Sequence, residues 1–325
     1  MIGQKSQRDP RHRVCLNKFV NVIWLAVMVV FTDNADAQSP ITALAFSTDY
    51  KHVIAGSHLG LLIEDWPGLH GGRTKPLEMD SIHDVSFSPD GRHLLIAGGS
   101  PGVAGIVQLR RWPNLELVRS WSEHQDVVYA IAWRADGKEW VSSSWDGYCR
   151  VCKIDALVAH VTMSNHSGPV FAAMYLPGGQ IASAGADRTI VVWDSSSGLP
   201  SKILRQHTAT VHALACQASE VAKVGEPLLA SAGEDRTVRF WQPSIGRMVR
   251  FQRFKSTPRS IAWTMDGRWL MVGCDDGRVF QLDPIQLTTE ELLLQNASVI
   301  NLLVDMDGEI CFSHRWAVKK IEKRR

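Results

Sequence analysis

The sequence predicts an all-β fold, a seven-bladed β-propeller made of four-stranded antiparallel blades. A motif in which an apolar residue is followed five positions later by a second, usually large, apolar residue recurs seven times. The copies start 41 to 47 residues apart, a period typical of propeller blades. Between the copies, short strand-like segments alternate with Gly, Asp and Pro turns, and no long segment has helical periodicity.

The repeats define a single domain that we expect to cover residues 38–325. One blade cannot bury both of its faces, so neighbouring blades must pack against each other. We expect the last blade to be incomplete if the segment before residue 38 is removed. The predicted blades start near residues 41, 82, 128, 170, 211, 258 and 299.

We interpret residues 1–37 as a secretory signal peptide. Basic residues precede the segment 19–31, which is apolar in twelve of thirteen positions, and Ala35-Asp36-Ala37 resembles a cleavage site. This predicts an extracytoplasmic protein, periplasmic or secreted, with no membrane span in the mature chain, because crossing a bilayer takes about 20 residues. Two alternatives are an uncleaved anchor, and a cytoplasmic protein in which residues 27–32 supply the outer strand of blade seven.

The charge balance gives no indication of nucleic-acid binding. The first 37 residues hold five basic and three acidic residues, which leaves 30 of each in the remainder. A body with no net charge has no large field to attract a polyanion. We therefore expect a protein or peptide partner, no nucleic acid, and a monomer that works within a complex.

A polar pattern recurs in the fourth and fifth copies. It consists of a His before the first strand, a Ser on the second, an Asp in the next turn and a Trp on the third. The two sets are His166, Ser183, Asp187, Trp193 and His207, Ser231, Asp235, Trp241. In the third copy His124, Ser142 and Asp146 fit, but Cys152 stands at the Trp position.

This pattern closely resembles the WD40-repeat family, strongly in two blades, fairly in one and weakly elsewhere. The resemblance implies that each set forms a hydrogen-bonded chain inside its blade. The chemistry agrees, since a buried imidazole, hydroxyl and carboxylate all need partners.

The same His, Ser and Asp residues could suggest a hydrolase, but we interpret them as structural. Identical active sites in successive blades are improbable, so we predict no catalytic residues. Cys149 and Cys152 are three apart on one strand and must point to opposite faces, so we expect no metal or redox site there and no cofactor. The alternative is a propeller enzyme, lactonase-like or a quinoprotein, with its site in the central funnel, where only His83, Asp84 and His212 are polar and able to point inward.

The resemblance also implies a binding face, because partners of this family most often bind the face that carries the His loops and Asp turns. Exposed Trp and Arg are enriched in binding hot spots. We therefore expect a non-catalytic interaction scaffold whose candidate contacts are Trp145, Arg315, Trp316, Glu234 and Asp275.

Overall fold

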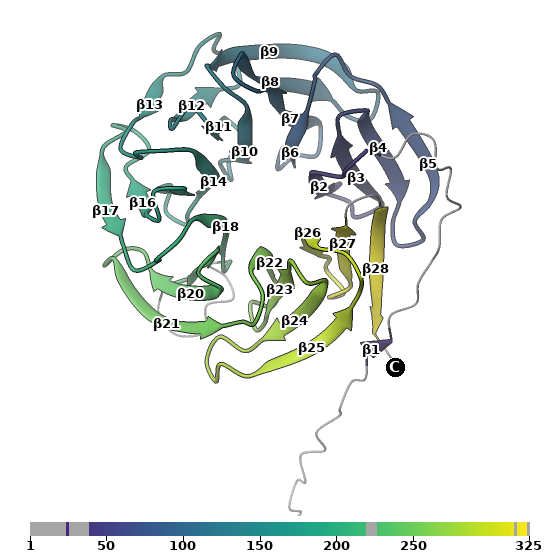
Figure 1. Ribbon diagram of the computed structural model, residues 1–325. Coiled ribbons are helices and arrows are strands. Elements are labelled where there is room, and N and C mark those ends of the chain that lie inside the picture. Colours follow the sequence, from purple (N-terminus) through teal and green to yellow (C-terminus); the bar gives the residue numbers. More distant parts are fainter. Residues whose placement is uncertain (1–23, 26–38, 219–225, 315–316, 324–325) are drawn as a thin grey trace, which may run out of the picture.

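Seven antiparallel sheets surround a central axis and form a disc, which confirms the predicted seven-bladed β-propeller (Figure 1). The computed structural model describes residues 24–25, 39–218, 226–314 and 317–323. These residues form strands, turns and loops. Within them, no helix has the length and apolar character needed to cross a bilayer.

The first six blades each consist of four consecutive strands, and the first strand of each blade lies innermost (Figure 1). Blade one contains β2 (Ala43–Phe46), β3 (His52–Ser57), β4 (Gly60–Asp65) and β5 (His70–Lys75). Blade two contains β6 (Ile82–Phe87), β7 (His93–Ser100), β8 (Ala104–Arg111) and β9 (Glu116–His124). Blade three contains β10 (Val128–Trp133), β11 (Glu139–Ser144), β12 (Cys149–Lys153) and β13 (Val161–Met163).

The next three blades repeat this order. Blade four contains β14 (Val170–Tyr175), β15 (Ile181–Gly185), β16 (Ile190–Trp193) and β17 (Pro200–Leu204). Blade five contains β18 (Val211–Cys216), β19 (Leu229–Gly233), β20 (Thr237–Gln242) and β21 (Arg247–Arg253). Blade six contains β22 (Pro258–Trp263), β23 (Leu270–Cys274), β24 (Arg278–Leu282) and β25 (Thr289–Leu294).

Blade seven is built from three consecutive strands, β26 (Val299–Val304), β27 (Ile310–His314) and β28 (Ala317–Lys323). The two-residue strand β1 (Trp24–Leu25) pairs antiparallel with the outer edge of β28. The segment 27–32, which the alternative interpretation placed at this edge, lies outside the described residues.

Seven buried apolar clusters occupy the seven interfaces between neighbouring blades. The cluster that closes the ring joins Val53 and Leu44 of blade one to Cys311 and Val318 of blade seven. A hydrogen bond reinforces this closure, since the Trp66 indole N–H donates to the Asp305 carboxylate at 2.8 Å. Each blade therefore buries both faces against its neighbours, as the repeat argument requires.

Short polar turns connect the first and second strands in every blade except blade five. In blade two the Ser88 hydroxyl donates to the Asp90 carboxylate at 2.6 Å, and the same carboxylate accepts the backbone N–H of Arg92 at 3.0 Å. Gly91 follows with φ of 70°, a conformation that favours glycine. These bonds explain why Asp-Gly pairs mark the turns in the sequence.

A β-bulge interrupts the first strand of blades two to seven. The register between first and second strands shifts across the strand's second residue, as between Val128 and Ala130 in blade three. A bulge redirects the side chain of the extra residue. The residues at the bulges are His83, Tyr129, Phe171, His212, Arg259 and Ile300.

Candidate functional site

The polar sets of blades four and five each form a continuous hydrogen-bonded chain. In blade four, His166 Nδ1 lies 2.9 Å from the Asp187 carboxylate and His166 Nε2 lies 2.7 Å from the Ser183 hydroxyl. The Trp193 indole N–H donates to that hydroxyl at 2.7 Å. Blade five repeats the chain within 0.1 Å through His207, Ser231, Asp235 and Trp241.

Blade three keeps three members of this chain and replaces the fourth. His124 contacts the Asp146 carboxylate and the Ser142 hydroxyl, each at 2.8 Å. The Trp that fills this space stands on the neighbouring strand, where Trp140 is the cross-strand partner of Cys152. Its indole Nε1 is buried and, in the described residues, makes no hydrogen bond.

The environments of these chains favour ionised carboxylates and, in blades three and five, a neutral imidazole. Burial lowers the pKa of His124 and His207, although the hydrogen bond to the carboxylate acts in the opposite direction. Burial acts to raise the pKa of Asp187, but its contacts with His166 and its hydrogen bonds from Thr189 together outweigh this effect and lower the pKa to about 2. The groups are satisfied within the blade, so their geometry is that of a structural network.

The bulges gather five side chains from five successive blades at the channel mouth, the end of the central channel on the face of the His loops and Asp turns. We call His83, Tyr129, Phe171, His212 and Arg259 the mouth arc. Their contacts are continuous: ring centroids lie 4.7 Å apart for His83 and Tyr129, 5.2 Å for Tyr129 and Phe171, and 5.5 Å for Phe171 and His212. Arg259 then donates to His212 Nε2 at 2.8 Å.

Trp145 extends the aromatic half of the mouth arc towards solvent. Its ring lies 5.9 Å from that of Tyr129 and 5.8 Å from that of Phe171, and the residue is 47% exposed. The Trp145 backbone N–H donates to Val127 at 3.0 Å, which fixes the turn that carries it. Three adjoining aromatic side chains therefore form a rigid, partly exposed surface at the mouth.

The other half of the mouth arc is ionic. Arg259 Nε lies 2.8 and 2.9 Å from the two Asp275 carboxylate oxygens, and Glu234 lies 3.1 Å from His212 Nε2. Burial lowers the pKa of His212, and the adjacent Arg259 charge adds to this effect. Arg259 donates to His212 Nε2 and also lies 3.9 Å from the Glu234 carboxylate, which is 44% exposed and so still offers an oxygen to solvent.

Asp84 lies beside the mouth arc but serves the framework. Its carboxylate accepts the backbone N–H of Val85 and that of Ile131 in blade three, both at 2.8 Å. Burial raises its pKa to about 7, although both hydrogen bonds act to lower it. Asp84 thus ties two blades together.

Metal and redox chemistry have no assembled site in the described residues. No three His, Cys, Asp or Glu side chains in that part of the chain are grouped so that they could hold a metal ion. Cys149 packs in the cluster between blades three and four, whereas Cys152 packs in the cluster between blades two and three. The pair therefore points to opposite faces, as strand alternation predicts.

The structure brings three sequence-predicted contacts to the mouth: Trp145, Glu234 and Asp275. Arg315 and Trp316 lie outside the described residues. Sequence reasoning missed Tyr129, Phe171 and Arg259, which hold these three residues in place. The available signal was a bulky or charged residue directly after the first apolar residue of five successive repeats.

Comparison with known proteins identifies repeats in the middle of the chain. Residues 115–153, 159–194, 198–242 and 250–283 match the family described as WD domain, G-beta repeat. These segments include blades four and five, whose polar chains are complete, and blade three, whose chain lacks only the Trp.

Several curated proteins share this similarity over part of their length. The chain is 34% identical over 83 residues to the F-box-like/WD repeat-containing protein TBL1X of Mus musculus, a match covering 25% of the chain and 16% of that protein. It is 32% identical over 143 residues to the anaphase-promoting complex subunit cdc20 of Dictyostelium discoideum, covering 42% of the chain and 27% of that protein. It is 26% identical over 175 residues to WD repeat-containing protein 90 of Mus musculus, covering 53% and 9%.

The matched regions are thus minor parts of these relatives, and what they share with the chain is the repeat. Seven four-stranded blades, the hydrogen-bonded His–Ser–Asp–Trp chains and the matched repeats lead to one assignment. The chain is a WD40-repeat β-propeller protein.

Proposed function

We propose that this propeller is a non-catalytic scaffold that binds a protein or peptide at the channel mouth, as a monomer within a complex. The observation that carries the proposal is the mouth arc with Trp145. It combines aromatic surface, which supplies most of the energy in binding hot spots, with Glu234 and Asp275, which can fix the orientation of a peptide. The names of two relatives, an F-box-like/WD repeat-containing protein and a subunit of the anaphase-promoting complex, are consistent with a role in the assembly of protein complexes.

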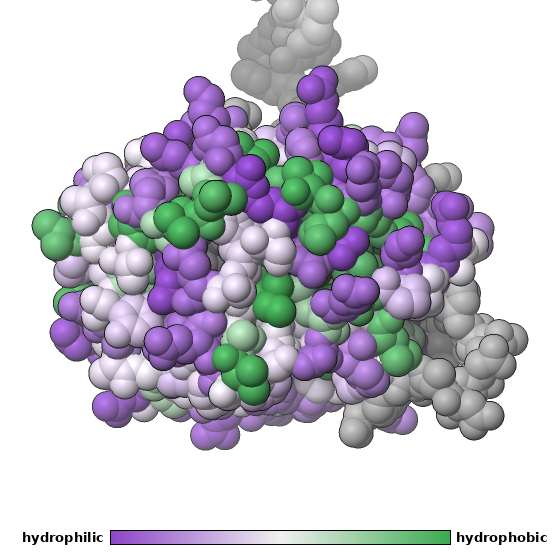
Figure 2. Space-filling model, turned by 90° about the horizontal axis from the view of Figure 1, so that it is seen from above, coloured by the Kyte–Doolittle hydropathy of each residue, from purple (hydrophilic) through white to green (hydrophobic). Residues whose placement is uncertain are grey.

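The rim offers a weaker alternative surface. Figure 2 shows one side of the disc, where apolar residues form small separate areas among hydrophilic ones. Exposed aliphatic residues such as Leu199 and Ile245 stand singly in the turns between third and fourth strands. Isolated apolar residues are normal on a protein surface, whereas contiguous aromatic groups indicate binding.

Selection of peptides from a random display library on the immobilised full chain tests this proposal. We expect enriched peptides to bind the wild-type protein and to bind Trp145→Ala at least tenfold more weakly. Ile245→Ala, which removes an exposed side chain from the rim, is the matched control and should bind normally. Failure to enrich any peptide, or equal binding to both variants, would contradict the proposal.

We also propose that residues 1–37 direct export. The support is the order of basic, apolar and small residues in that segment. The pairing of Trp24–Leu25 with β28 favours the second candidate, a cytoplasmic protein whose amino-terminal segment completes blade seven. Sequencing the amino terminus of the protein from its native cell separates the two. A start at Gln38 supports export, and an intact Met1 supports ring closure.

A further inference from the structure

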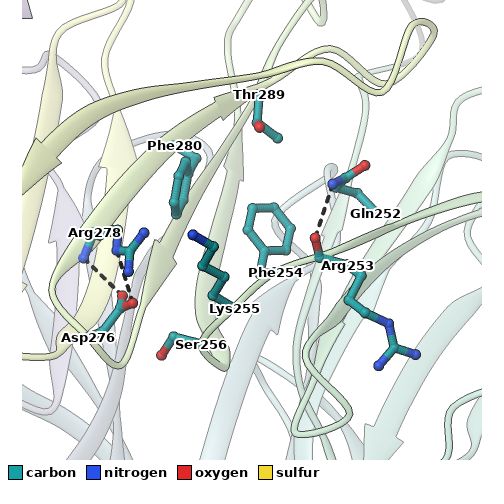
Figure 3. Close-up of a pocket in the computed structure, with 9 residues that line it drawn as sticks. All are labelled: Gln252, Arg253, Phe254, Lys255, Ser256, Asp276, Arg278, Phe280 and Thr289. Atoms are coloured by element: carbon teal, nitrogen blue, oxygen red, sulfur yellow. Dashed lines mark hydrogen bonds and ion pairs between the residues drawn. The ribbon is translucent and has the colours of Figure 1, made fainter.

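A pocket of about 260 Å³ lies between blades five and six. The end of β21, the crossover 254–257 and strands β24 and β25 line it (Figure 3). One end of the pocket adjoins the mouth arc, because the turn that supplies Asp276 to the pocket also supplies Asp275 to Arg259.

The pocket occurs where blade six lacks the polar chain. In blade six, Leu282 is the cross-strand partner of Leu270. The corresponding pair in blade five is Trp241 and Leu229, so Leu282 stands at the position of the Trp. Phe254 lies four residues before the first strand of blade six, at the position where blade five has His207. Asp276 is the only polar member that remains among the described residues, and it has lost its imidazole partner.

Loss of the imidazole changes what the Asp does to the crossover. In blades three, four and five the carboxylate also accepts the backbone N–H of the residue after the His, at 3.0 to 3.2 Å. In blade six, Asp276 keeps only the bond that all four carboxylates accept from the backbone N–H two residues on, here that of Arg278 at 3.3 Å, and its other oxygen lies 3.0 Å from the Arg278 Nε. Within the described residues no hydrogen bond joins Asp276 to Lys255. The crossover 254–257 is therefore not held against the turn that carries Asp276, and a gap remains between them.

The walls of this gap combine apolar and cationic groups. The rings of Phe254 and Phe280 pack together with centroids 5.3 Å apart, and Lys255 lines the same pocket (Figure 3). Arg278 is balanced by Asp276 and by Glu291, 3.7 Å away. The exposed Lys255 ammonium makes no ion pair with any described residue, and the same holds for Arg253, the other exposed cation of the lining. Figure 3 shows the Arg253 side chain pointing away from the two phenyl rings, whereas Lys255 lies beside them.

We propose that this pocket binds an oxyanion, a phosphate or carboxylate group, carried on an apolar or aromatic stem of a partner peptide. Lys255 pairs with the anion, and Arg278 retains N–H groups that can donate to it. Hydroxyl groups of Ser256 and Thr289 line the same space. The two phenyl rings contact the stem. The inference rests on the proposed peptide-binding role of this face and adds a second contact beside the mouth.

Three small probes test the pocket by ligand-observed NMR titration of the full chain: phenyl phosphate, phenylacetate and benzyl alcohol. We expect the wild-type protein to bind at least one of the two anions at least tenfold more tightly than benzyl alcohol. Lys255→Gln should weaken anion binding at least fivefold. Lys138→Gln, which neutralises an exposed lysine in a turn of blade three, should leave it unchanged.

The arms of the experiment separate the sources of the anion. Tighter binding of phenyl phosphate identifies a phosphorylated side chain, and tighter binding of phenylacetate identifies a carboxylate. Equal binding of the neutral alcohol, or undiminished anion binding by a folded Lys255→Gln protein, overturns the proposal. Trp145→Ala should still bind the anion, so failure of the mouth and failure of the pocket are distinguishable.

Discussion

At the scale of single residues, the serine of each complete polar chain is the hydrogen-bond partner of two buried groups, an imidazole and an indole. Ser183 contacts both the His166 imidazole and the Trp193 indole, whereas Ser142 contacts the His124 imidazole and has no Trp to bind. Leaving a buried polar group without a partner costs about 1 to 3 kcal/mol. The two serines therefore differ in the number of groups that their removal leaves unpaired.

We expect Ser183→Ala to lower the free energy of unfolding by about 2 to 3 kcal/mol, because two buried groups lose their partner. Ser142→Ala is the matched control and should cost about half as much. Urea unfolding followed by tryptophan fluorescence gives both values. Equal losses in the two variants would contradict the hydrogen-bonded chain as the source of the stability.

The pH dependence of stability reports on Asp84. The pKa of this carboxyl is raised to about 7 in the folded protein, so the folded state binds a proton that the unfolded state releases above its ordinary value near 3.8. Asp84 therefore weakens the fold progressively as the pH rises from about 4 to 7, by at most about 1.4 kcal/mol per pH unit. The lowered pKa values of His124 and His207 act oppositely and remove stability as the pH falls below 6.5.

Asp84→Asn removes the first of these two effects. We expect the stability of the variant relative to wild type to improve as the pH rises from 5 to about 7 and to level off above that, whatever the constant cost of the amide. Chemical denaturation at four pH values in that range measures the difference. A difference that does not change with pH would show that Asp84 is ionised in the folded protein at pH 5.

At the scale of strands, blade three keeps one large and one small side chain in a cross-strand pair but places the large one on the opposite strand from blade four. Trp140 and Cys152 face each other across β11 and β12, and Ile181 and Trp193 do so in blade four. The large side chain has moved to the partner strand, and its ring packs 5.1 Å from that of Trp121. The space is filled, but the indole no longer reaches the serine.

Reversing the exchange should restore the chain. Cys152→Trp alone should destabilise the protein by about 1 to 3 kcal/mol through overpacking, and Trp140→Ile alone by a similar or larger amount through a cavity. We expect the double variant to be more stable than the sum of the single effects by at least about 1 kcal/mol. Additive effects in a double-mutant cycle would contradict the compensation.

The sequence predicts strands and repeats better than it predicts the mouth. Turn residues and the polar pattern at His166 and His207 are local signals, so they locate the blades. The orientation of Tyr129 and Phe171 depends on a bulge, which the alternation of apolar residues does not reveal. The empty pocket beside Lys255 depends on the absence of a bond, which only the packed structure shows.

At the scale of the whole molecule, the seven interfaces between blades all contain an apolar cluster but differ in the polar contacts that accompany it. Blades three to five are held by polar chains as well as apolar clusters, and the joint between blades one and seven by the Trp66–Asp305 hydrogen bond. The ring positions five bulged side chains from five separate repeats as one surface. The proposed binding site is therefore a property of the closed disc, since no single blade contains it.

Site-specific photo-crosslinking in the native cell tests this account most directly. A benzoylphenylalanine placed at position 145 should form a discrete adduct with a partner protein, and the same group at position 245 on the rim should form none. Introducing Phe171→Ala into the first protein should reduce that adduct strongly, because the partner loses an aromatic contact next to position 145. Adducts at the rim with none at the mouth would contradict the account.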